Sequence, residues 1–199
     1  FGGALNVEAK GSVAGATVTA TASQAGEVTT VDASLDTQRL DHLGALAGVE
    51  VSGALKARVS GTLGGAEGGL KLDASIANGR YGNTEIGDAT LTATGPNAAL
   101  AIELKGRAPM APRVVDYRIS AVVADFASAR VSALSVSSAS ESLVANGPFT
   151  VEFANDVLVR DLKVSVARAG RQAGTIAANA TLAPGGAKAD ATFSAIDLE

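Results

Sequence analysis

The stretch VEVSGALKARVS, residues 49–60, decides the fold class of this chain. Its odd-numbered positions hold Val, Val, Gly, Leu, Ala and Val, and its even-numbered positions hold Glu, Ser, Ala, Lys, Arg and Ser. In an extended strand this period of two places the apolar side chains on one face and most polar ones on the other. We therefore predict an amphipathic β-strand with one face that must be covered.

The same alternation recurs along the rest of the chain. Thr side chains dominate the polar positions at residues 17–21 and 90–94, which suits the solvated face of a sheet. Further alternating runs lie at residues 70–76, 98–104, 115–123, 149–153, 162–166 and 176–182.

Turn signals separate these runs at short intervals. We expect a tight reversal over residues 78–83, and further turns at residues 95–97, 146–148 and 184–186. Short turns join antiparallel neighbours, because parallel strands need long crossovers. The sequence therefore predicts an all-β fold, a long and mostly antiparallel meander of about a dozen strands, with residues 1–199 as a single unit.

Three stretches depart from the alternation. Leu40, Leu43 and Leu46 have helical spacing, which predicts one short helix near 37–47 with Asp36 or Thr37 as N-cap and Gly48 as C-terminal cap. Two prolines in residues 105–113 predict a loop there. Residues 135–142 are polar and only weakly periodic.

Composition excludes several kinds of chemistry. The chain has no Cys and one His, which excludes disulfides, thiol catalysis and multi-histidine metal sites. Its 16 basic and 20 acidic residues give a net charge of −4, so nucleic-acid binding is not expected. The chain is 47% hydrophobic but has only 5 Phe, 2 Tyr and no Trp. Its apolar surface is therefore either a thin core or spread along an extended object.

The candidate catalytic and phosphate-binding motifs have simpler interpretations. Asp41 and His42 could be combined with Ser34 or Ser52 into a triad, but no nucleophile elbow accompanies them. The glycines at 64–69 precede a strand and lack the Lys-Ser/Thr of a phosphate loop, so we expect a hairpin tip. The basic pairs Lys56/Arg58 and Arg168/Arg171 are interpreted as solvated residues that protect edge strands from aggregation.

The apolar faces of the strands can be covered in two ways. A sandwich or solenoid would fill its interior with its own side chains. A sheet curled along its length would instead form an apolar trough, and small Val, Leu and Ala side chains would leave room for hydrocarbon. Each buried methylene of a bound acyl chain would contribute about 0.8 kcal/mol.

Two stretches resemble a known family. Residues 34–63, SLDTQRLDHLGALAGVEVSGALKARVSGTL, have a short Leu-spaced helix, a glycine, a strand that returns through Gly-x-Leu, and a Ser-Gly-Thr-Leu step. Residues 141–153, ESLVANGPFTVEF, lead through 159–162 into the glycine-interrupted strand at 174–176. Both resemble the periplasmic repeat region of the TamB family (translocation and assembly module), within the AsmA-like superfamily.

The resemblance implies a β-taco, a repeating β-groove, in a segment of a larger periplasmic protein anchored in the inner membrane. It implies a non-enzymatic lipid-transfer conduit that moves phospholipid between the inner and outer membranes and supports outer-membrane biogenesis. Phospholipid acyl chains are the expected ligands, and an Omp85-class outer-membrane barrel is a possible partner through other parts of the protein. The segment itself is not expected to span a membrane, and no catalytic residue, metal or cofactor is implied.

The resemblance also implies which residues line the groove, namely the apolar strand positions. Two other functions stay open: a structural β-solenoid or adhesin-like stalk without ligand, and a hydrolase that uses Asp41 and His42. The expected lining residues are Val51, Leu55, Val59, Leu70, Leu72, Ile76, Leu91, Leu100, Ile102, Leu104, Val151, Phe153, Val164 and Val166.

Overall fold

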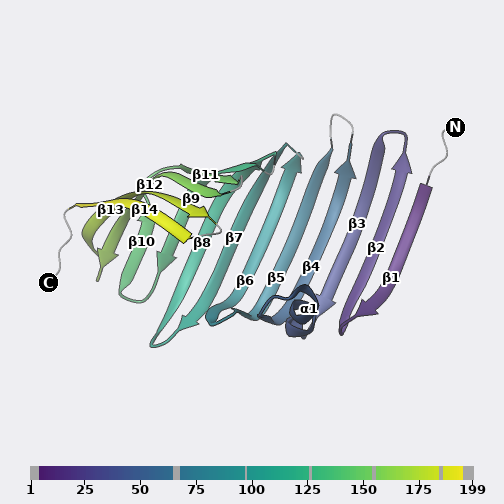
Figure 1. The fold of residues 1–199 in the computed structure, drawn as a ribbon, viewed down its shortest axis with the longest axis horizontal. Coiled ribbons are helices and arrows are strands. Elements are labelled where there is room, and N and C mark those ends of the chain that lie inside the picture. Colours follow the sequence, from purple (N-terminus) through teal and green to yellow (C-terminus); the bar gives the residue numbers. More distant parts are fainter. Residues whose placement is uncertain are drawn as a thin grey trace.

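The described residues form one antiparallel sheet of 14 strands with one short helix (Figure 1). The computed structural model describes residues 5–64, 68–96, 98–125, 127–153, 156–183 and 186–194. The predicted all-β antiparallel meander is confirmed. Its elements are β1 (Leu5–Val13), β2 (Ala16–Ala25), β3 (Val28–Thr37), α1 (Leu40–Ala47), β4 (Val51–Leu63), β5 (Gly69–Tyr81), β6 (Thr84–Pro96), β7 (Ala99–Met110), β8 (Arg113–Ala124), β9 (Ser128–Ser137), β10 (Glu141–Ala145), β11 (Phe149–Phe153), β12 (Val157–Arg168), β13 (Arg171–Ala183) and β14 (Gly186–Ser194).

Each strand pairs with its neighbours in the chain, apart from one interruption. β10 and β11 both pair with β9 and with β12, so together they occupy the place of a single broken strand. The break falls at Asn146-Gly147-Pro148, where Pro148 has no N–H to donate to a ladder. The turn predicted there is therefore present, but it interrupts a strand instead of reversing the chain between neighbours.

The strand register brings apolar residues together on one face of the sheet. One row crosses eight strands, and its members are Leu55, Ile76, Ala89, Gly106, Tyr117, Val136, Leu143 and Val166. The next row contains Leu35, Ala57, Ala74, Leu91, Leu104, Ile119 and Leu134. We call this the concave face, because a common groove is formed over it.

The opposite face, which we call the outer face, carries cross-strand ion pairs. Asp32 pairs with Arg58 at 2.8 Å, and Asp36 pairs with Lys56 at 3.4 Å. Glu103 lies against Arg118, and Lys105 is 3.2 Å from the same carboxylate. Such exposed pairs contribute little stability individually. A one-residue slip in register would nevertheless move these charges onto the apolar face, so they help to specify it.

The sheet is curled, most visibly in its C-terminal strands (Figure 1). Adjacent strands lie about 4.8 Å apart, so β4 and β9 would be about 24 Å apart in a flat sheet. A single cavity nevertheless contacts side chains from β4 to β9. The concave face must therefore bend around that space.

Part of the curled region has a packed interior. Ala121, Ala129, Val131 and Phe149 form a buried cluster on the concave face of β8, β9 and β11. Val151, Val159 and Leu162 are among the partly buried side chains around it. This cluster gives β8, β9 and β11 a small buried core. The edge strands β1 and β14 differ, because all of their residues are exposed.

The helix α1 connects β3 to β4 at one end of the strands, which we call the helix end (Figure 1). Gly48 adopts the predicted left-handed conformation as C-cap, with φ of 69°. The predicted N-cap is wrong, because the N-cap residue is Arg39 and makes no side-chain cap bond. Asp36 and Thr37 instead pair with β4, and the buried Thr37 hydroxyl accepts the Arg39 N–H at 3.1 Å.

The reversal predicted over residues 78–83 is present at Gly82 and Asn83, between β5 and β6, but two details of the predictions from Gly and Pro differ. Asn78 and Gly79 do not reverse the chain, because β5 continues through them to Tyr81, with irregular pairing to β6 and φ of 51° at Asn78. The loop predicted over residues 105–113 is reduced to a turn at residues 111–112, because β7 extends to Met110 and β8 starts at Arg113. Pro109 is tolerated beside the hairpin turn, where one missing ladder bond costs little.

The edge-strand interpretation of the basic pairs is also wrong. β4, which carries Lys56 and Arg58, has β3 on one side and β5 on the other. β12, which carries Arg168, is likewise paired on both sides. The weakly periodic residues 135–142 contain the end of β9 and the start of β10. Residues 65–67, 97 and 184–185, within the predicted turns, lie outside the described residues.

Candidate functional site

The candidate site is an apolar groove on the concave face between β4 and β9. It encloses about 710 Å³. Side chains from successive strands meet over it because the register aligns apolar residues in rows across the sheet. Its apolar lining comprises Leu55, Ala74, Ile76, Ile86, Ala89, Leu91, Leu104, Ala108, Met110, Val115, Tyr117, Ile119, Leu134 and Val136.

The structure places four of the predicted lining residues directly in this groove. They are Leu55, Ile76, Leu91 and Leu104. The register puts Val59, Leu70, Leu72, Leu100 and Ile102 on the same face, farther from the helix end.

The remaining predicted residues lie at the two sides of the groove. Val51 packs beneath α1, where its side chain faces Gly44. Val151 packs against the buried cluster, and Val164 is itself buried. Phe153 lies at the end of β11, and Val166 lines a second cavity described below. Residues from β8 and β9 complete the groove, and only a register between distant strands could have identified them as its lining.

Tyr117 provides the one phenol in the groove lining. Its hydroxyl donates a hydrogen bond to the Ile86 carbonyl at 3.1 Å. Burial raises the pKa of Tyr117, and the nearby Asp88 carboxylate acts in the same direction. With its hydroxyl bonded to backbone, Tyr117 presents mainly its ring to the groove, which keeps this lining apolar.

A second cavity of about 450 Å³ adjoins the groove and shares Val115 and Val136 with it. Its apolar walls include Leu143, Val166 and Ile176. At the helix end its lining changes to Arg113, Glu141 and Arg168. Arg113 is ion-paired with Glu141, and Arg168 Nε is 4.0 Å from a Glu141 oxygen. The groove therefore continues from an apolar region into a charged one.

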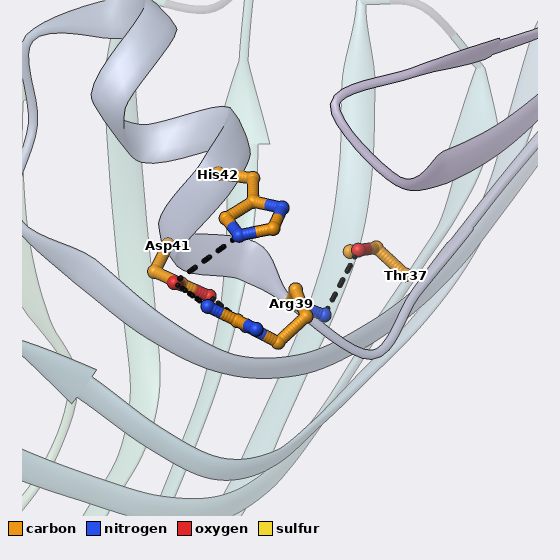
Figure 2. A network of polar contacts seen from close by, with 4 residues as sticks. All are labelled: Thr37, Arg39, Asp41 and His42. Carbon is orange, nitrogen blue, oxygen red and sulfur yellow. Dashed lines mark hydrogen bonds and ion pairs between the residues drawn. The ribbon is translucent and has the colours of Figure 1, made fainter.

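Asp41, at the start of α1, contacts both Arg39 and His42 (Figure 2). The Arg39 guanidinium donates to both Asp41 carboxylate oxygens, at 3.1 and 2.9 Å, and this bond lowers the pKa of Asp41. His42 Nε2 is 3.8 Å from Asp41, and the Ser34 hydroxyl is bonded to Thr19 at 2.7 Å. Over the part of the chain that the structure describes, no hydrogen bond joins His42 to a serine.

The described ranges contain no helix with the length and apolar character needed to cross a membrane. Within those same ranges, no group of three or more His, Cys, Asp or Glu side chains is placed to hold a metal ion.

The fold and the groove define the class of protein: an all-β, curled antiparallel sheet with an apolar concave face and a charged outer face. In comparisons with protein-family models, curated proteins and solved structures, the chain matches none of them.

Proposed function

We propose that this chain binds the acyl chains of phospholipid in its concave groove and is a segment of a lipid-transfer conduit. The observation that carries the proposal is the groove of about 710 Å³, whose lining from six strands is almost wholly apolar. Hydrocarbon suits such a lining because it requires no hydrogen bonds. The protein's role in this proposal is to shield and guide lipid without chemical conversion.

The shape of the apolar face supports a conduit more than a closed pocket. Apolar residues of concave parity continue to both edge strands, for example Val7 in β1 and Phe193 in β14. Val7 is 52% exposed and Phe193 is 59% exposed. Apolar residues of the concave face therefore extend beyond the groove on both sides, to the edges of the sheet.

The resemblance to the TamB family extends the proposal. A member of that family would carry phospholipid between the inner and outer membranes from within the periplasm, and would contribute to outer-membrane biogenesis with an Omp85-class partner. The alternation that carries this resemblance is the same feature that produces the apolar rows of the concave face. We propose membership of that family and a periplasmic location on this basis.

Site-specific photo-crosslinking tests the lipid-binding proposal. A photoreactive phenylalanine analogue is introduced at Leu104, which lines the groove, or at the adjacent Lys105, which lies on the outer face. After expression in bacteria with labelled phospholipid, we expect crosslinks at position 104 and few or none at position 105. Equal crosslinking at both positions, or none at either, would contradict the proposal.

A ligand-free structural stalk is the second candidate, and the packed cluster around Phe149 favours it. If such packing extended along the concave face in solution, the interior would be dry and filled. Native mass spectrometry of the protein purified without detergent distinguishes the two candidates. Bound species with phospholipid masses support the groove proposal, whereas a protein free of lipid supports the stalk.

A further inference from the structure

The charged end of the second cavity differs from the other charged sites on the sheet. Arg113 is two residues before Val115, Glu141 is two before Leu143, and Arg168 is two after Val166. The period of two therefore places all three on the concave face, beside residues that line the cavity. The cross-strand pairs Asp32–Arg58, Asp36–Lys56 and Glu152–Arg160 lie on the outer face. Charge at this end of the concave face therefore requires its own explanation.

The cluster has an excess of positive charge. Glu141 is engaged by Arg113, whereas Arg168 reaches it only at 4.0 Å and so keeps donors available. Arg171 is the register partner of Arg168 across the β12–β13 hairpin, and its side chain emerges on the same face. In the described part of the chain, no carboxylate forms an ion pair with Arg171. Three arginines and one glutamate leave a net charge of about +2 at this end.

Arg113 and Arg168 line the end of an apolar cavity that continues into the main groove through Val115 and Val136, and Arg171 is the register partner of Arg168 beside it. Arginine suits phosphate because its planar fork donates two parallel hydrogen bonds to two oxygens. An apolar channel that ends in such donors is complementary to a molecule with a hydrocarbon body and an anionic phosphate head. Ser138 also lines this end, where its hydroxyl accepts the Glu141 N–H at 3.3 Å.

We infer that Arg168 and Arg171, with the Arg113–Glu141 pair beside them, bind the phosphate of a glycerophospholipid whose acyl chains occupy the groove. This inference rests on the proposed function. It adds to that function the place where the lipid headgroup binds. It also predicts that lipids with a phosphate group bind more tightly than lipids without one, and that a headgroup with a net negative charge binds more tightly than a neutral headgroup. The positive charge also gives the lipid an orientation, with its head at the helix end.

Lipid uptake from vesicles tests the inference. Vesicles of dioleoyl phosphatidylcholine carry either a pyrene-labelled phosphatidylglycerol or a diacylglycerol with the same labelled acyl chains. The wild-type protein is incubated with each kind of vesicle, and pyrene fluorescence reports any transfer of the labelled lipid to the protein. We expect the affinity for phosphatidylglycerol to be about tenfold higher than that for diacylglycerol, because hydrogen bonds between arginine and a charged phosphate contribute a free energy of this size.

The double variant Arg168→Gln with Arg171→Gln isolates the headgroup contact. We expect it to lower phosphatidylglycerol uptake about tenfold, to the level of diacylglycerol, and to leave diacylglycerol uptake unchanged. The matched control, Arg58→Gln with Arg160→Gln, removes the same charge from the outer face and is expected to change neither uptake. Circular dichroism checks that both variants are folded, and Arg168→Lys with Arg171→Lys is expected to retain part of the preference.

The outcomes separate this inference from the proposed function. If the wild-type protein takes up neither lipid, the proposed function fails, and this inference fails with it. If it takes up both lipids equally, the groove binds acyl chains and the headgroup inference is overturned. An equal loss in the outer-face control would attribute the effect to overall charge and would also overturn it. Binding of inorganic phosphate at this cluster, without any uptake of lipid, would likewise overturn the headgroup inference.

Discussion

The ring of Tyr117 lies over Gly106, its register partner on the neighbouring strand β7. A methyl group at position 106 would overlap the ring and the hydroxyl of Tyr117. Because glycine leaves this space free, the tyrosine crosses β7 and donates its hydrogen bond to Ile86 on β6. A missing side chain on one strand therefore allows an interaction between the two strands that flank it, at the centre of the groove lining.

Gly106→Val is expected to displace Tyr117 and break its bond to Ile86. Overpacking of this kind costs about 1–3 kcal/mol, which urea unfolding measures as a lower midpoint. Gly11→Ala is the matched control, because a Cβ at Gly11 meets nothing within 4 Å. An unchanged midpoint for Gly106→Val would contradict the described position of the ring.

The raised pKa of Tyr117 predicts a pH dependence of stability. Its ordinary pKa is 10.0, and in the fold the neutral phenol is favoured by burial and by Asp88. Above pH 10 the unfolded chain loses this proton while the folded chain retains it, so stability falls as pH rises. Urea unfolding from about pH 9 to about pH 11 measures the decline. Tyr117→Phe should reduce its slope, and identical slopes in both proteins would exclude Tyr117 as the cause.

Gly44→Ala is expected to destabilise the protein although alanine favours helices. A Cβ at Gly44 would lie 2.6 Å from Val51 Cγ2 and 2.5 Å from the Val49 carbonyl oxygen. Separating α1 from β4 costs about 1–3 kcal/mol, which exceeds the gain of about 1 kcal/mol in helix propensity. Leu46→Ala, at a position 70% exposed on the same helix, should change stability by less than about 0.5 kcal/mol. A more stable Gly44→Ala variant would show that the helix packs differently.

Phe149 and Phe153 belong to the same strand and are expected to differ in their contribution to stability. Phe149 is 8% exposed and packs in the buried cluster, so Phe149→Ala should cost about 3–4 kcal/mol. Phe153 is 43% exposed, so Phe153→Ala should cost about 1 kcal/mol or less. Chemical denaturation of both variants gives the comparison. Equal losses would mean that the cluster around Phe149 is not packed in solution.

Much of the fold could be predicted from residues that are close in sequence. The alternation in residues 49–60 identifies a strand and assigns Leu55 and Lys56 to opposite faces, because successive side chains of a strand point in opposite directions. Gly48 marks the end of the helix because glycine enters the left-handed region without a steric penalty. Local signals failed at Asn78, whose φ of 51° interrupts the pairing of β5 without ending the strand, and at Pro109, which is still paired with Val114 of the neighbouring strand.

The sequence by itself determined that this protein is a meander of amphipathic strands with one apolar face, because alternation and short turns are local properties. Only the tertiary structure decided how far that face curls, which strands share the groove, and that Arg113, Glu141 and Arg168 meet at its end. Those features depend on register, irregular pairing and packing between strands far apart in the chain. A charged residue such as Arg168, which looks solvated on its own strand, acquires a role through the neighbours that the register gives it.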